Sequence, residues 1–208
     1  MNSPEYNNVF NFNNQENKKL ITSLINDFVT NGQGVLRLDF SKVDYDFQVR
    51  EVLVNAIGKK FLVEAREGKF KENPIVVFID EAHQFLNKSI KDEYFDTKPL
   101  DSFELISKEA RKYGLFLCLA TQMPRDIPIG TLSQMGTFIV HRLINDKDKQ
   151  SIENAASSAN KSALSFLPIL GEGEALLVGV DFPMPLLLKI DEPSKKPISN
   201  TPKLQKKQ

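Results

Sequence analysis

The spacing of apolar residues along this 208-residue chain predicts helices that alternate with strands. Between residues 18 and 30, apolar side chains recur three and four positions apart, which is the spacing of one helix face. A longer stretch with the same spacing runs to about Glu67, and Ser41 or Asp44 is its candidate N-terminal cap. Further helices are predicted at 100–113, closed by Gly114, and at 147–159.

Short, largely apolar runs between these helices predict strands, at 35–40, 75–79, 115–120, 137–143, 175–180 and 186–190. The run at 75–79 is apolar at every position and mostly β-branched, as expected of a strand buried on both faces of a parallel sheet. Strands that alternate with helices predict an α/β fold, with a mostly parallel sheet flanked by helices. The polar, charged insert at 87–98 is expected to be a loop.

Both ends of the chain differ from the rest in composition. Residues 1–17 are rich in Asn and have little apolar periodicity, so they are expected to be a disordered or truncated start. Residues 191–208 are rich in Pro, Ser and Lys and are expected to form a flexible basic tail, which either contacts a polyanion or only improves solubility. One domain is therefore expected at 18–190.

Composition excludes several classes of protein. Hydrophobic residues make up 41% of the chain, enough for a core, and Lys plus Arg equal Asp plus Glu at 27 each. Bulk charge therefore gives no reason to expect nucleic-acid or membrane binding. A single cysteine, Cys118, excludes a disulfide framework and a cysteine-based zinc site. We expect a cytoplasmic protein without a membrane span, because no apolar run approaches the roughly 20 residues that a span requires.

Two adjacent acids, Asp80 and Glu81, follow the apolar run at 75–79. A buried parallel strand delivers the residues after it to the carboxyl edge of the sheet, where α/β proteins bind ligands. There Asp80 is suited to hold Mg²⁺ through coordinated waters, and Glu81 to polarise a water that attacks ATP. The simpler interpretation is a strand followed by a helix whose first turn favours acids.

The phosphate-binding motif that usually accompanies such acids is missing from the sequence. No Gly-x-x-x-x-Gly-Lys-Ser/Thr string occurs in the 208 residues. The nearest glycine-rich stretch, at 31–34, has no Lys-Ser/Thr after it and is better interpreted as a turn before a strand.

Thr121 and Gln122 follow the strand predicted at 115–120, so they should emerge at the same edge as the two acids. An amide placed there can sense a γ-phosphate or the attacking water, although an ordinary loop amide is the simpler interpretation. Arg111 lies in the last turn of the preceding helix. It either stabilises charge on a transferring phosphoryl group or only offsets the helix dipole.

Taken in order, these segments resemble the HerA family of hexameric DNA-translocating ATPases, within the wider HerA–FtsK group. The similar stretches lie between about residues 34 and 190, at 74–85, 109–114, 119–124, 132–134, 140–148 and 167–178. A DEAH-type helicase also matches residues 80–83. It would need a second domain downstream, for which too few residues follow, so we set it aside.

The resemblance implies the C-terminal half of a RecA-like P-loop NTPase core with a closing β-hairpin, using ATP and Mg²⁺. It makes Asp80 the Walker B metal residue, Glu81 the catalytic base and Gln122 the sensor, with Thr121 beside the nucleotide. Arg111 and Arg142 become candidates for contacts across the subunit interface, one of them an arginine finger. His83 is expected only to pack or to cap a helix.

The resemblance also implies a homo-oligomer, a hexameric ring around double-stranded DNA, with a nuclease or another effector as partner. The family's P-loop would lie upstream of residue 1. The sequence therefore predicts part of an ATP-dependent translocase or helicase that is inactive as this chain alone. The alternative is a non-catalytic ring-forming or interaction module derived from such an ATPase.

Overall fold

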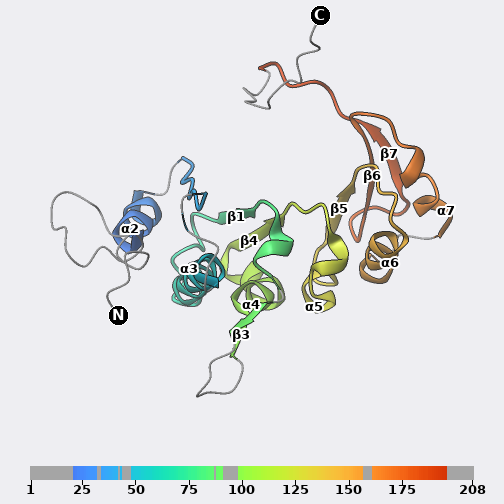
Figure 1. Cartoon of the computed structure of the whole chain (residues 1–208). Helices are drawn as coiled ribbons and strands as arrows, with labels where there is room; N and C mark the ends of the chain where they lie inside the picture. The colour runs from blue at the N-terminus through green and yellow to red at the C-terminus, as the bar shows by residue number, and fades with distance from the viewer. Residues whose placement is uncertain are drawn as a thin grey trace, which may run out of the picture. The chain divides into compact units, whose positions relative to one another are not determined.

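The computed structural model describes residues 21–31, 34–41, 43, 48–86, 88–90, 98–156 and 161–195 (Figure 1). The chain divides into two compact units, Met1–Met135 and Gly136–Gln208, which are described separately below. Residues 1–17, and the tail beyond Lys195, lie outside the described residues. Within the described ranges, every helix is too short or too polar to span a lipid bilayer.

The first unit contains one parallel pair of strands with helices against it. Its helices and strands are α2 (Ile21–Asn31), α3 (Val49–Arg66), β1 (Ile75–Ile79), β2 (Lys88–Ile90), β3 (Lys98–Leu100), α4 (Ser102–Glu109), β4 (Leu115–Leu119) and α5 (Ile129–Leu132). Three short 3₁₀ helices join them: η2 (Ala82–Gln84), η3 (Ala110–Tyr113) and η4 (Pro124–Asp126). β1 and β4 run parallel in register, from Ile75 beside Leu115 to Ile79 beside Leu119.

Helices α3 and α4 pack on each other and contact β4, and in Figure 1 both lie on the same side of the β1–β4 pair. Gly58 of α3 allows this close approach, because a Cβ there would lie 2.5 Å from Oγ of Ser102. The buried Asn55 of α3 accepts a hydrogen bond from the backbone N–H of Ser102 at 3.0 Å. One helix thus satisfies a free N–H at the start of the other.

The turn at Gly114 aligns the two strands. Gly114 has φ +81° and ends η3, as the sequence predicted, and a Cβ there would lie 2.0 Å from the carbonyl oxygen of Phe70. Its own carbonyl accepts from the N–H of Ile75 at 2.9 Å, which fixes the start of β1 beside the start of β4. A residue other than glycine would be strained at this φ and would displace that contact.

The second unit is an antiparallel sheet with short helices. It contains β5 (Thr137–Val140), α6 (Asp146–Ala155), α7 (Lys161–Leu164), η5 (Leu167–Ile169), β6 (Glu174–Gly179) and β7 (Leu186–Lys189). β6 pairs with both β5 and β7, so the closing hairpin is confirmed. Asn145 caps α6 by accepting from the N–H of Lys147 at 2.9 Å. The hydrogen bond from Lys149 lowers the pKa of Asp146 below its ordinary value.

Two expectations about the sheet were wrong. Residues 35–40 form no strand, and Val35 is 94% exposed. Among the described strands only β1 and β4 pair in parallel, so the sheet is not mostly parallel. None of the described strands pairs with residues 35–40, so their backbone groups make no sheet hydrogen bonds.

Three local expectations also need correction. The insert at 87–98 is not simply a loop, because β2 and β3 pair there as an antiparallel hairpin. The long helix begins at Val49, after Gln48 at φ 55° with no side-chain cap, and not at Ser41; Asp44 lies outside the described residues. The helix expected at 100–113 changes to a 3₁₀ helix at Ala110.

Candidate active site

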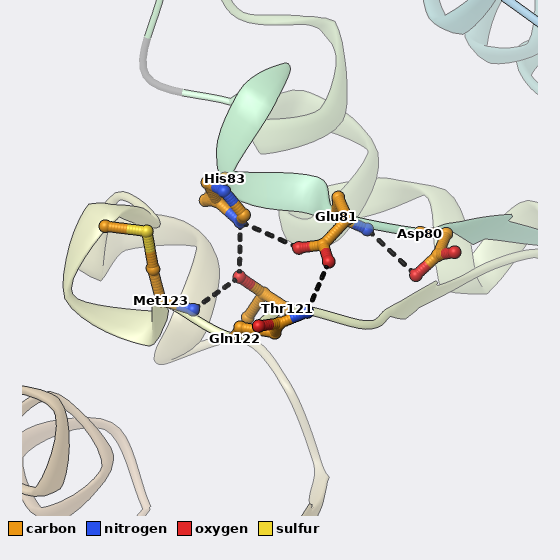
Figure 2. Close-up of polar contacts among 6 residues, drawn as sticks. All are labelled: Asp80, Glu81, His83, Thr121, Gln122 and Met123. Atoms are coloured by element: carbon orange, nitrogen blue, oxygen red, sulfur yellow. Dashed lines mark hydrogen bonds and ion pairs between the residues drawn. The ribbon is translucent and has the colours of Figure 1, made fainter. Parts of the chain in front are cut away.

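The polar residues predicted to meet at the carboxyl edge of the sheet do meet there. Asp80 and Glu81 follow β1, and Thr121 and Gln122 follow β4 one residue after it ends. Backbone hydrogen bonds extend the alignment past the strands, since Ala120 donates to Ile79 and Ala82 donates to Ala120, both at 2.9 Å. Figure 2 shows the four side chains gathered beside His83 and Met123.

Glu81 is the centre of this cluster. Its side chain is half-buried, and Oε1 accepts a hydrogen bond from Nε2 of Gln122 at 2.7 Å. Oε2 is screened from solvent and lies 3.3 Å from Nδ1 of His83 (Figure 2). Oε2 accepts no hydrogen bond of good geometry from the described residues, so it is a buried acceptor without a donor there.

The backbone at Glu81 is itself unusual. It adopts the left-handed conformation, with φ 48° and ψ 47°, between β1 and η2. Of the described residues other than glycine, only Gln48 also has a positive φ. This conformation is costly for a residue with a Cβ, and such strain is found most often at functional sites.

Asp80 is exposed at the tip of β1. Its Oδ1 accepts from the backbone N–H of Glu81 at 3.0 Å, which holds the carboxylate at the sheet edge (Figure 2). Among the described residues, no three His, Cys, Asp or Glu side chains gather to form a metal site by themselves. Mg²⁺ usually takes one or two carboxylates and fills its remaining positions with water and phosphate oxygens. The exposed Asp80 carboxylate fits an ion bound in that way.

Thr121 connects the loop after β4 to His83. Its Oγ1 accepts from the backbone N–H of Met123 at 3.1 Å and lies 3.0 Å from Nδ1 of His83 (Figure 2). The expectation that His83 has no role beyond packing or capping overlooked this position. The sequence carried one signal for it, the spacing of His83 two residues after Glu81, but only η2 turns the ring toward Thr121.

Arg111 does not lie in this cluster. Arg111 is exposed in η3, which ends just before β4 and therefore lies at the amino edge of the sheet. The five residues of β1 separate that edge from Glu81 by about 16 Å. Arg142 is exposed after β5, in the second unit.

The model of the helicase HerA-like C-terminal family matches residues 52–184, which is more than half of the chain. This range includes the whole cluster around Glu81, all of α4 and β4, and the antiparallel strands β5 and β6.

Curated relatives also match this chain. A probable helicase of Methanocaldococcus jannaschii is 37% identical over 129 residues, covering 61% of this chain and 24% of the relative. The DNA double-strand break repair helicase HerA of Sulfolobus acidocaldarius is 24% identical over 200 residues, covering 86% of this chain and 39% of the relative. The chain thus spans between about a quarter and two fifths of the length of these two relatives.

Among solved structures, the chain resembles B204, the DNA-packaging ATPase from Sulfolobus turreted icosahedral virus. The TM-score is 0.52 at 18% identity, over 85% of this chain and 81% of that one. This likeness supports the α/β fold of the chain. With the family match over residues 52–184, the comparisons show that the chain belongs to the helicase HerA-like C-terminal family.

Proposed function

We propose that this chain supplies the metal-binding and water-activating residues of a HerA-type, ATP-dependent DNA translocase or helicase. The observation that carries the proposal is the 2.7 Å hydrogen bond between Gln122 and Glu81, which joins the ends of two strands 41 residues apart. A half-buried acid and an amide, held together at the carboxyl edge of a parallel pair, are the groups needed to orient an attacking water.

Four residues at the ends of β1 and β4 have roles in this proposal. Asp80 would hold Mg²⁺, which neutralises charge on the phosphates of ATP when bound. Glu81 accepts the proton of the attacking water, while Gln122 holds Oε1 and reports whether a γ-phosphate is present. Thr121 stands beside them, where its hydroxyl can contact the nucleotide.

The remaining part of the site would come from further polypeptide, either continuous with this sequence or on a separate chain. The sequence contains no P-loop string to bind the phosphates. The structure supports the same proposal, because Val76, Phe78 and Phe116 form an exposed apolar face on the β1–β4 pair. Parallel sheets are normally covered on both faces, so this face is suited to receive the phosphate-binding part.

In this proposal the arginines and DNA make their contacts only in the assembled ring. Arg111 lies at the edge opposite Glu81, so it would act only on a nucleotide bound by a neighbouring subunit of a hexameric ring. Arg142 is the second candidate for that contact. The segments 123–134 and 87–98 would face double-stranded DNA in the pore. A nuclease or another effector would complete the assembly.

A non-catalytic interaction module is the second candidate function. The exposed apolar face of β1 and β4 favours it, since a module that only docks also needs such a face. The cluster around Glu81 favours the ATPase, because docking alone does not require a half-buried acid in a strained backbone conformation, held by an amide.

The test uses the complete assembly, with the P-loop part supplied either on the same chain or as a second protein. We expect ATP hydrolysis that Glu81→Gln abolishes and Glu72→Gln leaves unchanged. Glu72 is an exposed glutamate before β1, at the opposite edge of the sheet. DNA binding should weaken steeply with salt, since contacts to the phosphate backbone release counterions.

Assembly without hydrolysis would favour the interaction module. Binding of DNA that is unaffected by salt would contradict the translocase.

A further inference from the structure

His83 is the member of the cluster to which the proposed ATPase reaction assigns no role. Its side chain is only 17% exposed, and Nδ1 lies 3.0 Å from Oγ1 of Thr121 and 3.3 Å from Oε2 of Glu81 (Figure 2). One ring nitrogen therefore faces two oxygens, one at the end of β4 and one at the end of β1. This position is more specific than packing or helix capping requires.

The chemistry of the two oxygens fixes where the ring proton belongs. An ionised carboxylate only accepts hydrogen bonds, and Thr121 Oγ1 has two lone pairs, one of them used by Met123 N–H. A bare Nδ1 lone pair beside the carboxylate of Glu81 would be repelled. A proton on Nδ1 is attracted by both oxygens, so the geometry favours the tautomer with Nδ1–H.

We propose that His83 is a positioning residue for Glu81, through an Nδ1–H that donates to Thr121 and faces Oε2 of Glu81. The inference rests on the proposed ATPase function and deepens it. Glu81 is then held from both sides by one loop: Gln122 donates to Oε1, and Thr121 holds the ring that faces Oε2. At 3.3 Å the contact with Oε2 is long for a hydrogen bond, so it directs the oxygen without occupying it.

This arrangement links the loop after β4 to the catalytic acid. A shift of the loop when a γ-phosphate binds or leaves would move Gln122 and the His83 ring together, because Thr121 and Gln122 are adjacent. Both contacts on the Glu81 carboxylate would change in the same step. His83 therefore makes the position of Glu81 depend on the state of the sensor loop.

Two substitutions of His83 distinguish a positioning role from a packing role. His83→Phe keeps a flat ring of similar size and removes the donor. His83→Asn loses most of the ring but places an amide N–H near the position of Nδ1. If His83 only packs, His83→Phe is the milder change. If His83 positions Glu81, His83→Asn is the milder change, because only it retains the donor.

The first measurement needs no ATPase activity and uses this full chain. Long-range ¹H–¹⁵N spectra of the two histidines are recorded above the pH at which imidazole is ordinarily charged. His141 is the internal reference, because its Nδ1 lies 2.9 Å from the backbone oxygen of Glu174, which accepts only. We expect the Nδ1–H tautomer for both rings. Glu81→Gln and Thr121→Val should change the His83 signals alone, and Thr121→Ser should restore them.

The second measurement is steady-state hydrolysis of ATP by the complete assembly. We expect His83→Phe to lower kcat by about 10- to 100-fold with little change in KM, since a misplaced catalytic group costs that much. His83→Asn should stay close to the wild type.

The two measurements distinguish failure of the proposed ATPase function from failure of the proposed role of His83. Absence of Glu81-dependent hydrolysis in the assembly would overturn the proposed function, while the spectra would still decide whether His83 contacts Glu81. Hydrolysis that His83→Phe leaves unchanged would overturn the role of His83 alone. A proton on Nε2 in place of Nδ1, or His83 signals that do not respond to Glu81→Gln, would also overturn it.

Discussion

The two faces of the β1–β4 pair have similar apolar sequences but opposite surroundings. On the inner face, toward α3 and α4, Leu115 is 1% exposed and Ile79 is buried. On the outer face, Phe78 is 75% exposed, with Val76 and Phe116 beside it. The sequence of β1 and β4 is thus suited to a sheet covered on both sides, whereas the described structure covers one.

The two faces therefore have different roles, the inner face in folding and the outer face in assembly. The inner face, packed on α3 and α4, stabilises the first unit, and the outer face is free to bind a further segment. The site around Glu81 lies at the edge between them, so its residues can come together without the phosphate-binding part that we propose. Substitutions on each face and in the turn between the strands, and modification of Cys118, test this difference between the faces.

The largest effect is expected on the inner face. Leu115→Ala should lower the free energy of unfolding by about 2–5 kcal/mol, because it removes buried methyl groups and leaves a cavity. The matched change on the outer face, Phe78→Ala, should alter it by no more than about 0.5 kcal/mol. Urea unfolding of the two variants measures both. Equal destabilisation would mean that the outer face is covered in the chain as it exists.

A smaller effect is expected at the turn that holds β1 and β4 in register. Gly114→Ala should cost about 3 kcal/mol, because the new Cβ meets the carbonyl of Phe70 and strains the backbone. Gly68→Ala is the control: it has a similar φ of +83°, but its new Cβ would meet only the Lys71 side chain, at 3.8 Å, so only about 1 kcal/mol of strain is expected. Thermal or urea unfolding would contradict this if the two variants were equally stable.

Cys118 offers a probe that leaves stability almost unchanged. It is exposed and lies beside Phe78 in the register of the outer face. A thiol reagent should therefore modify it in the folded chain and react much more slowly once the phosphate-binding part is added. Protection of Cys118 in the chain alone would contradict an open outer face, and unchanged reactivity in the assembly would place the added part elsewhere.

The sequence predicted the positions of the polar residues at the sheet edge better than it predicted which strands pair. The positions of Asp80, Glu81, Thr121 and Gln122 follow from the ends of two apolar runs, and Gly114 from a local backbone requirement. These features depend on short stretches of chain. The strand expected at 35–40 and the hairpin of β2 and β3 depend on which neighbours are present, and periodicity alone does not specify neighbours.

His83 was missed for a related reason. A histidine two residues after an acid has no fixed direction until the intervening backbone is known. Here the left-handed conformation of Glu81 and the turn of η2 bring the ring to Thr121. The direction of the His83 side chain depends on the backbone conformation at Glu81, which the spacing of residues in the sequence does not give.

The most direct test of the incomplete site is ATP hydrolysis by this chain alone. Without groups that bind and position the phosphates, Glu81 has no substrate to act on, so the purified wild-type chain and its Glu81→Gln variant should show the same background rate. Turnover by the wild-type chain that Glu81→Gln abolishes would contradict this account, because it would show that these 208 residues form a complete site.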